Sequence, residues 1–361
     1  MKNLWSVIMA GGIGERFWPL STQKEPKQFL PVFTGTPLLK AAADRMGNVI
    51  PSSRAVVVTN AAYAKKSADL FSKTMRPFII GEPVGKNTAP AIAAAAAYIE
   101  RKDSTAVMAV FSADHIIQPE SKFRDSVKLA AEDAEKNGSL VCLGVKPNFP
   151  HTGLGYIETA GVAASSKGIK LHKVRRFVEK PDLKKAQVFL KKGNYFWNCG
   201  IFVWSVKTIF AAFEKNMPKL YEQISEARKA KTDAAFSKAI NKFYLAVEKE
   251  SIDYGVLEKA SGIKVVECPI KWDDMGSYAA FKEHSSADKA GNVFKGDIVD
   301  LECSNTFVYS DGGLTVTAGL KDLFVVRSGN KVLVIQKDKL SDMRKIINLI
   351  KEKGFDKFLK E

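Results

Sequence analysis

The sequence is short of cysteine and histidine, the residue types on which most zinc sites and disulfide frameworks depend. Four cysteines (Cys142, Cys199, Cys268 and Cys303) are scattered without a Cys-x-x-Cys pair, and the four histidines show no His-x-x-x-His spacing. These absences exclude a zinc ribbon and a disulfide scaffold, and they disfavour a histidine-based zinc site. Scattered cysteines are typical of a protein of the reducing cytoplasm, and we expect that location.

Long apolar runs are also missing. No run reaches the roughly 18 residues that a membrane-spanning helix needs. The segment Met1–Ile8 lacks the apolar core and cleavage site of a signal peptide. We therefore expect no membrane partner. Hydrophobic residues make up 46% of the 361 residues and charged residues 26%, which excludes a disordered chain.

Acidic residues are in deficit, because 55 Lys and Arg face 39 Asp and Glu and give a net charge of +16. The lysines are spread along the chain, and the one dense basic cluster, Lys170–Arg176, alternates like a strand. Basic composition without a set of stacking aromatic residues or a base-reading helix is weak evidence for nucleic-acid binding. We expect no nucleic-acid partner. Phosphorylated small substrates would explain part of the surplus charge, and solubility the rest.

The first half of the chain alternates apolar runs with helical stretches. Continuous apolar runs predict buried strands at Leu4–Ala10, Arg54–Thr59, Pro77–Ile80, Ala106–Phe111 and Leu140–Val145. Helical composition separates them, at Pro37–Val49, Ala61–Ser72, Thr88–Arg101 and Lys122–Asn137. This alternation predicts an α/β fold: a Rossmann-like, mostly parallel mixed sheet flanked by helices. Ligands of such a sheet bind beyond the carboxyl ends of its strands.

From about residue 147 the pattern changes. Strands are expected at Gly153–Thr159, Lys170–Val178 and Gly200–Val206, with helices at Leu183–Lys191 and over Lys207–Val247. We interpret residues 147–285 as a second lobe on the same sheet, so that residues 1–285 form one domain whose first part is 1–146. Short strands and turns fill much of 286–361, which ends in an amphipathic helix at Leu340–Lys353. This segment is expected to be a small β-rich domain.

A glycine-rich loop follows the first strand. Residues Met9–Pro19 read Met-Ala-Gly-Gly-Ile-Gly-Glu-Arg-Phe-Trp-Pro. Neighbouring glycines let backbone N–H groups approach a phosphate chain, and Arg16 adds a charged fork for phosphate oxygens. The spacing matches neither the dinucleotide-binding fingerprint nor the Walker A motif. A glycine turn after a strand is often only structural, but Arg16 and the downstream Pro26–Phe29 favour a phosphate-binding loop.

Several ordered motifs over roughly residues 4–285 resemble the sugar-nucleotide pyrophosphorylases. They are the glycine loop with Pro26–Leu30, then Gly81–Pro83 with Lys86–Ala91, and then Trp272–Ser277. The last two, together with Glu15–Ser21 in the glycine loop, are most similar to members that transfer guanylate to mannose 1-phosphate. The resemblance implies that the C-terminal domain is left-handed β-helix-like. It also implies that residues 1–146 bind the nucleotide and 147–285 form a sugar-phosphate lobe.

The resemblance implies the following roles. The nucleotide phosphates are contacted by Gly11, Gly12, Gly14, Arg16 and Lys27, of which Arg16 and Lys27 are the catalytic pair. Glu82 accepts hydrogen bonds from guanine. The base or the ribose is contacted by Asn87 and Thr88. The sugar phosphate is bound by a second set of residues, in which Lys180 binds the phosphate group: Gly155, Tyr156, Glu179, Lys180, Asn198 and Asp253. Thr88 also fits a helix N-cap, and Asn198 and Asp253 also fit turn-stabilising residues.

Two carboxylates are implied as metal ligands. Asp114 follows the fourth predicted strand in the segment Ser112–His115, and Asp274 belongs to Trp272–Ser277. Mg²⁺ takes one or two carboxylates with phosphate oxygens, and Mn²⁺ or Co²⁺ can replace it. Asp alternatively caps turns. The family usually has proline where Ser112 stands, a change expected to alter the stiffness of the loop. Ser277 is expected to cap the following helix.

The expected activity is synthesis of GDP-mannose and pyrophosphate from GTP and mannose 1-phosphate by in-line attack on the α-phosphorus. A homodimer is expected. Two alternatives remain open: the same fold with another nucleotide or hexose phosphate, and a non-catalytic GDP-mannose-binding subunit. A subunit that had lost catalysis would be expected to lack Arg16, Lys27, Asp114 or Asp274, and all four are present. Longer family members carry an isomerase domain; residues 286–361 hold no histidine, and no isomerase activity is expected.

Overall fold

The computed structural model describes residues 2–361 and divides into two compact units. The first unit contains the chain up to Gly11 together with Leu39–Trp272, and the second contains Gly12–Leu38 together with Asp273–Glu361. This grouping does not follow the expected boundary near residue 285. The segment that carries most of the glycine-rich loop packs with the C-terminal strands and helices.

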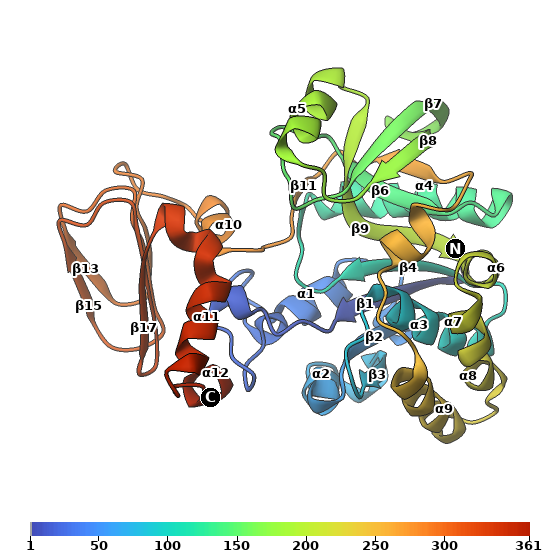
Figure 1. The fold of residues 1–361 in the computed structure, drawn as a ribbon, viewed down its shortest axis with the longest axis horizontal. Coiled ribbons are helices and arrows are strands. Elements are labelled where there is room, and N and C mark those ends of the chain that lie inside the picture. The colour runs from blue at the N-terminus through green and yellow to red at the C-terminus, as the bar shows by residue number, and fades with distance from the viewer. Residues whose placement is uncertain (1) are drawn as a thin grey trace. The chain divides into compact units, whose positions relative to one another are not determined.

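The first unit is built on one large mixed sheet (Figure 1). Its nine strands are arranged in the order β3-β2-β1-β4-β9-β6-β10-β8-β7. Their bounds are Leu4–Ala10 (β1), Ala55–Asn60 (β2), Phe78–Glu82 (β3), Val107–Ser112 (β4), Val141–Val145 (β6), Tyr156–Ser166 (β7), Ile169–Val178 (β8), Tyr195–Ser205 (β9) and Lys264–Glu267 (β10). A separate two-stranded sheet pairs β5 (Ile116–Gln118) with β11 (Lys271–Asp273).

The strand directions confirm the expected mixed sheet, which is parallel in its first half and mixed in its second. Strands β1 to β4 pair in parallel, whereas β9 lies antiparallel between β4 and β6. Parallel pairing brings the carboxyl ends of β1, β3 and β4 to one edge of the sheet. Gly11, Glu82 and Asp114 each stand at or just after one of these strand ends. All five strands predicted in the first half are present, with bounds shifted by at most two residues.

Helices cover both faces of this sheet. The helices of the first unit are α1 (Leu38–Asp44), α2 (Ala64–Asp69), α3 (Thr88–Lys102), α4 (Glu120–Asn137), α5 (Leu183–Lys192), α6 (Val206–Asn216), α7 (Pro218–Gln223), α8 (Ser225–Lys229) and α9 (Asp233–Ala246), with a π-helical turn at Asp253–Leu257. Phe111 meets Phe123 of α4, whereas its neighbour Val110 belongs to the cluster around α3. Successive residues of a strand point to opposite faces, which explains why both faces are apolar.

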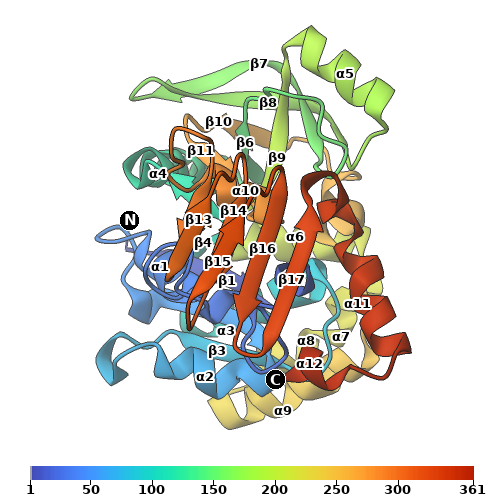
Figure 2. The ribbon, with the colours of Figure 1, turned by 90° about the vertical axis from the view of Figure 1, so that its left-hand side faces the viewer.

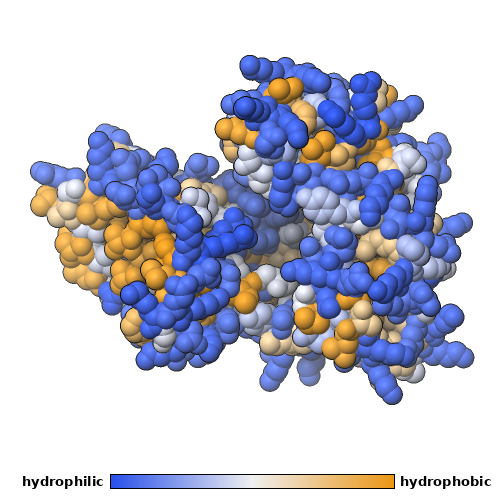
Figure 3. Space-filling view, viewed as in Figure 1, coloured by the Kyte–Doolittle hydropathy of each residue, from blue (hydrophilic) through white to orange (hydrophobic). Residues whose placement is uncertain are grey.

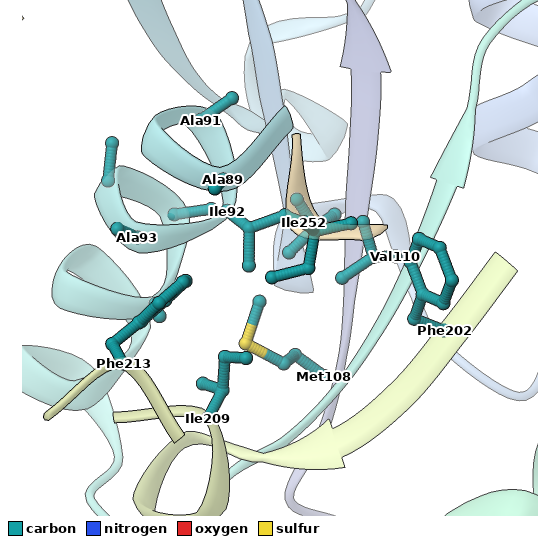
Figure 4. Packing of buried hydrophobic residues seen from close by; sticks show 14 of the residues in the cluster. Ala89, Ala91, Ile92, Ala93, Met108, Val110, Phe202, Ile209, Phe213 and Ile252 are labelled. Carbon is teal, nitrogen blue, oxygen red and sulfur yellow. The ribbon is translucent and has the colours of Figure 1, made fainter. Parts of the chain in front are cut away.

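Helix α3 fits closely because one of its segments is nearly all alanine. Every residue of 89–97 is buried, and Ile92 is the largest side chain among the alanines. Small side chains let the helix approach the sheet, and larger residues such as Met108, Ile209 and Phe213 fill the remaining space (Figure 4). The helix was predicted within one residue of its observed end.

The second unit is a β-helical winding with helices against it. Its strands are β12 (Val293–Lys295), β13 (Ile298–Leu301), β14 (Phe307–Ser310), β15 (Thr315–Ala318), β16 (Leu323–Ser328) and β17 (Lys331–Gln336), and its helices are α10 (Tyr278–Glu283), α11 (Met343–Glu352) and α12 (Lys357–Lys360). Strands β12, β14 and β16 pair in parallel, as do β13 and β15, and β17 closes the larger sheet (Figure 2).

The winding places chain segments from successive turns side by side. Val293 pairs with Phe307, and Phe307 pairs with Phe324, so the rings of Phe307 and Phe324 stack at 5.5 Å. The two intervals differ in length, which hides the repeat in the sequence. The expected β-helix-like domain is present, and its amphipathic helix α11 begins three residues later than predicted because Lys337–Asp342 is a 3₁₀ turn.

Candidate functional site

The glycine-rich loop is fixed within the second unit by a buried lysine. Lys27 is 4% exposed, and its ammonium donates to the backbone oxygens of Met275 at 2.5 Å and Asp274 at 3.3 Å. The same ammonium lies 5.0 Å from the centre of the Phe17 ring. Gly14 has a left-handed backbone (φ +78°), and a Cβ there would stand 2.5 Å from Cβ of Lys27. Only glycine gives Lys27 this position.

Arg16 and Asp274 converge over Gly276. A Cβ on Gly276 would lie 2.9 Å from a carboxylate oxygen of Asp274 and 3.2 Å from a guanidinium nitrogen of Arg16. The absent side chain therefore leaves room for both charged groups. This role of Gly276 was not predicted from the sequence, although its place two residues after a candidate acid was a visible signal.

The neighbouring acid, Asp273, has a structural role. Its Oδ1 accepts from the Met275 N–H at 2.6 Å, and its Oδ2 pairs with His284 at 3.4 Å. This turn holds Met275 in a left-handed conformation with φ +45°. Ser277 caps α10 by accepting from the Ala280 N–H, as predicted. Asp273 is therefore engaged by the backbone of its own turn and by His284.

In the first unit, Glu82 lies beside the start of the glycine loop. It ends β3 and is 5% exposed, and a Cβ on Gly11 would stand 3.1 Å from its Oε2. Burial raises the pKa of Glu82 to about 7, and the nearby Tyr244 hydroxyl partly offsets this effect. Oε1 is buried and makes no hydrogen bond of ordinary geometry within residues 2–361. A buried acceptor without a donor is costly, and a ligand N–H would satisfy it.

The Asn87–Thr88 pair joins two motifs of the first unit. Asn87, with φ +72°, caps α3 by accepting from the Thr88 N–H. The alternative role of Thr88 as this cap is wrong, because its hydroxyl instead accepts from the Ile252 N–H at 2.8 Å. Backbone hydrogen bonds from Ala89 to Glu250 and from Glu250 to Lys86 reinforce the join. Residues 86–89 are thus joined by hydrogen bonds to residues 250–252, which directly precede Asp253.

Four of the predicted sugar-site residues come together in a compact cluster, which we call the amide–carboxylate cluster: Gly155, Glu179, Asn198 and Asp253. Nδ2 of Asn198 donates to Oδ1 of Asp253 at 2.9 Å. A Cβ on Gly155 would lie 2.5 Å from Oε2 of Glu179 and 3.3 Å from Cβ of Asn198. That glutamate oxygen is buried and accepts no hydrogen bond from residues 2–361.

Two carboxylates in this cluster influence each other. Burial raises the pKa of Asp253 to about 6, and the negative charge of Glu179 adds to the rise. Lys180 forms an ion pair with Glu179 at 2.5 Å, which raises the pKa of the lysine. The Lys180 side chain remains 57% exposed, and its backbone is left-handed with φ +44°. An exposed ammonium beside buried acceptors suits a ligand with both hydroxyl and phosphate groups.

Tyr156 does not join the cluster. Its side chain is fully buried against Phe189, and its hydroxyl accepts from the His151 N–H at 2.9 Å. The expectation that Tyr156 lies alongside a sugar is thus not supported, because β7 directs this ring into the core beneath α5. Gly155, one position earlier, faces the cluster instead.

Asp114 lies in a turn that is held on both sides. The Ala113 N–H donates to the Met9 oxygen at 2.9 Å, and the oxygen of His115 accepts from Arg45 at 2.8 Å. Within residues 2–361 no group of three or more His, Cys, Asp or Glu side chains is arranged to hold a metal. Asp114 and Asp274 belong to different units, and their joint role in a metal site stays a prediction.

No helix in residues 2–361 is both long enough and apolar enough to cross a membrane. All four cysteines are buried and free.

We predict that Glu82→Gln changes how stability depends on pH. The pKa of Glu82 is raised from 4.5 to about 7, so between these values the folded chain holds a proton that the unfolded chain releases. The contribution of Glu82 to the free energy of unfolding therefore falls as pH rises through this window. Glu82→Gln should melt above the wild type at pH 8, and the difference should shrink at pH 5.

Thermal unfolding at both pH values measures this effect. The exposed Glu132 on α4 provides a matched control, Glu132→Gln, for which no such change is expected. Equal pH slopes for the wild type and Glu82→Gln would contradict the buried, proton-holding state of Glu82.

Comparison with known proteins supports one family over nearly the whole chain. A nucleotidyl transferase family model matches residues 5–291, and a model described as the MannoseP isomerase/GMP-like beta-helix domain matches 296–349. A mannose-1-phosphate guanylyltransferase of Escherichia coli K12 is 36% identical, across 98% of this chain and 74% of that protein. The Salmonella typhimurium LT2 mannose-1-phosphate guanylyltransferase ManC is 35% identical over the same shares.

A solved structure from Thermus thermophilus, titled mannose-1-phosphate geranyltransferase, has 31% identity and a TM-score of 0.84. The alignment covers 97% of this chain and 99% of that one. A Helicobacter pylori structure titled mannose-6-phosphate isomerase aligns with 75% of this chain and 99% of its own, at 25% identity and a TM-score of 0.58. The chain belongs to the nucleotidyl transferase family, among the mannose-1-phosphate guanylyltransferases.

Proposed function

We propose that the chain converts GTP and mannose 1-phosphate into GDP-mannose and pyrophosphate. The observation that carries this proposal is the amide–carboxylate cluster beside Lys180. It combines a glycine floor, an unsatisfied Glu179 oxygen and an exposed ammonium. Sugar hydroxyls can donate to the carboxylates, and the sugar phosphate can pair with Lys180. The relatives named above support mannose as the sugar.

On this proposal several groups of the chain contact the nucleotide. Glu82 accepts from the guanine donors N1–H and N2–H₂, which would satisfy its buried oxygen. The N–H groups of the loop starting at Gly11, together with Arg16, neutralise phosphate oxygens. Lys27 holds the loop and the Asp274 segment in register through backbone oxygens. Catalysis would consist mainly of positioning and charge neutralisation.

The reaction needs no covalent enzyme intermediate. A phosphate oxygen of the sugar phosphate attacks the α-phosphorus of GTP in line, and pyrophosphate leaves as the new P–O bond forms. Lys180 orients the attacking phosphate, while Asn198 and Asp253 fix the sugar ring. The hydrogen bond between the buried Asn198 and the partly buried Asp253 limits the motion of both groups, and this helps to hold the attacking oxygen in one place.

We further propose that Asp114 and Asp274 hold Mg²⁺, or Mn²⁺ or Co²⁺ in its place. Their oxygens suit a hard divalent cation that completes its shell with phosphate oxygens and water. The room over Gly276, which a Cβ would fill, leaves the Asp274 carboxylate accessible, while Asp273 is engaged elsewhere. When bound, such an ion supplies Lewis-acid polarisation of the α-phosphate.

A homodimer is part of the proposal, with the β-helical strands as its interface. Val299 and Leu301 of β13 and Val316 of β15 are 52–63% exposed, as is Leu314 next to β15. Figure 3 shows apolar side chains gathered over this region. A two-fold partner presents the same patch, which makes an apolar face self-complementary. Sedimentation equilibrium should give twice the mass of the chain; a monomer at micromolar concentration would contradict this interface.

We also propose a cytoplasmic location, because the four cysteines are free thiols, as is usual in a reducing compartment.

GTP with mannose 1-phosphate should be the best substrate pair. Pyrophosphate release is measured with each common NTP and hexose 1-phosphate in the presence of Mg²⁺. A greater kcat/KM with dTTP or UTP and glucose 1-phosphate would assign the fold to another sugar nucleotide. Binding of GDP-mannose without turnover of any pair would point to the non-catalytic subunit instead.

Lys180→Ala should weaken sugar-phosphate binding much more than GTP binding. Loss of a charge-assisted phosphate contact costs about 1.5–3 kcal/mol, or roughly tenfold to a hundredfold in KM for mannose 1-phosphate. The matched control is Lys184→Ala, an exposed lysine near the start of α5 in the same lobe. An unchanged KM for mannose 1-phosphate in Lys180→Ala would exclude the anchoring role.

Asp114→Asn and Asp274→Asn should each lower kcat by about a hundredfold or more, the effect of losing one electrostatic transition-state group. The double variant should be little worse than either single variant, because residues that act as a unit are not additive. Asp273→Asn tests whether the neighbouring acid is merely structural, with a smaller effect expected. Near-normal turnover in a single variant at saturating Mg²⁺ would remove that residue from the metal site.

A further inference from the structure

A buried arginine lies beneath the turn that carries Asp114. Arg45 follows α1, is 3% exposed, and donates from Nη2 to the His115 oxygen at 2.8 Å. Its Nε lies 3.8 Å from Glu120, at the edge of an ion pair. Nε and Nη1 are buried and make no hydrogen bond within residues 2–361. Arginine is rarely buried with donors unused, so a role beyond packing is indicated.

The turn is fixed at three points around Asp114. On one side, the Ala113 N–H is bound to β1 through Met9. On the other side, the oxygen of His115 is held by Arg45, and Nδ1 of His115 accepts from Nε1 of Trp272 at 3.3 Å. The rings of His115 and Trp272 meet edge to face at 5.3 Å. Asp114 is therefore a partly exposed residue, and the residues on either side of it, Ala113 and His115, are held by hydrogen bonds.

We propose that Arg45 is a positioning residue for Asp114, which holds the backbone of the Asp114–His115 turn so that the carboxylate faces a divalent metal. This inference rests on the proposed metal role of Asp114. Residues that do not touch the metal but hold a metal ligand in place typically change metal affinity or activity by tenfold to a hundredfold. Nothing in the motifs that suggested the site includes Arg45.

A pure charge effect would act in the opposite direction. Burial lowers the pKa of Arg45 to about 10, which leaves the guanidinium positively charged at neutral pH, and its charge is close enough to Asp114 for the two to interact. A cation near a metal ligand repels the metal, so its removal alone would tighten metal binding. If positioning dominates, removal of Arg45 weakens metal binding. The sign of the change therefore separates the two effects.

The test measures Mn²⁺ binding to the full chain with saturating GDP-mannose. Free Mn²⁺ is followed by electron paramagnetic resonance, after subtraction of a titration of GDP-mannose alone. Arg45→Met should raise the Mn²⁺ dissociation constant about tenfold or more. Arg45→Lys keeps the charge and one donor, and it should lie between Arg45→Met and the wild type. Trp272→Phe removes the second tether on His115 and should change affinity in the same direction.

Arg101 provides the matched control. Its side chain is also buried, its Nε donates to the backbone oxygen of Ala230 at 2.6 Å, and its Nη1 also lacks a partner within residues 2–361. Arg101→Met should lower the melting temperature but leave Mn²⁺ affinity within about twofold, the ordinary scatter of a remote substitution. If Arg45→Met does not fold, Arg45→Lys and Trp272→Phe decide the outcome.

Asp114→Asn separates failure of the inference from failure of the proposed function. If Asp114→Asn leaves Mn²⁺ affinity unchanged, the metal role of Asp114 fails, and the role of Arg45 fails with it. If Asp114→Asn abolishes binding while Arg45→Met leaves affinity unchanged or tighter, only the positioning role is overturned. Arg45→Met added to Asp114→Asn should weaken binding no further, because Arg45 acts through Asp114.

Discussion

The contact between the Lys27 ammonium and the backbone oxygens of Asp274 and Met275 is the constraint on which the second unit depends. It joins segments that lie 247 and 248 positions apart in the chain. A lysine ammonium has strong hydration to lose on burial, so it remains inside only where oxygens replace water. Here two carbonyls and the Phe17 ring do so. Gly14 is required because any side chain there would displace Lys27. A Cβ on Gly276 would crowd the charged ends of Arg16 and Asp274.

In the first unit a comparable join is made without charge. The Thr88 hydroxyl and two backbone hydrogen bonds tie the start of α3 to residues 250–252, and the next residue is Asp253. A shift of α3 would therefore move Asp253 and, through its hydrogen bond, Asn198. The polyalanine face of α3 opposes such a shift because it is packed closely on the sheet. The same helix thus fixes the segment after Glu82 and one wall of the amide–carboxylate cluster.

The sequence was sufficient to predict the strands of the first half of the chain, because buried parallel strands are continuous apolar runs, as in Leu4–Ala10. The sequence was less informative about where a strand begins and which face of the sheet a given side chain occupies. Asn198 was placed before a strand, yet β9 runs from Tyr195 to Ser205 with a left-handed Gly200 that the apolar pattern did not reveal. Motif spacing found Gly155 but not the direction of Tyr156, because successive strand residues face opposite sides. Tertiary partners such as Arg45 carry no local signal at all.

Some of the strained backbone and unsatisfied buried polar atoms of residues 2–361 belong to the candidate-site residues. Asn87, Lys180 and Met275 are left-handed without being glycine, a conformation that costs of order 1–3 kcal/mol where the surroundings impose it. Glu82 and Glu179 each bury an oxygen without a donor among residues 2–361. A chain selected only for stability would relieve both kinds of cost, by glycine in the turns and by apolar residues in the walls. Their persistence at the ends of the strands is understandable if a ligand supplies the missing donors, because the free energy withheld from folding then appears as binding.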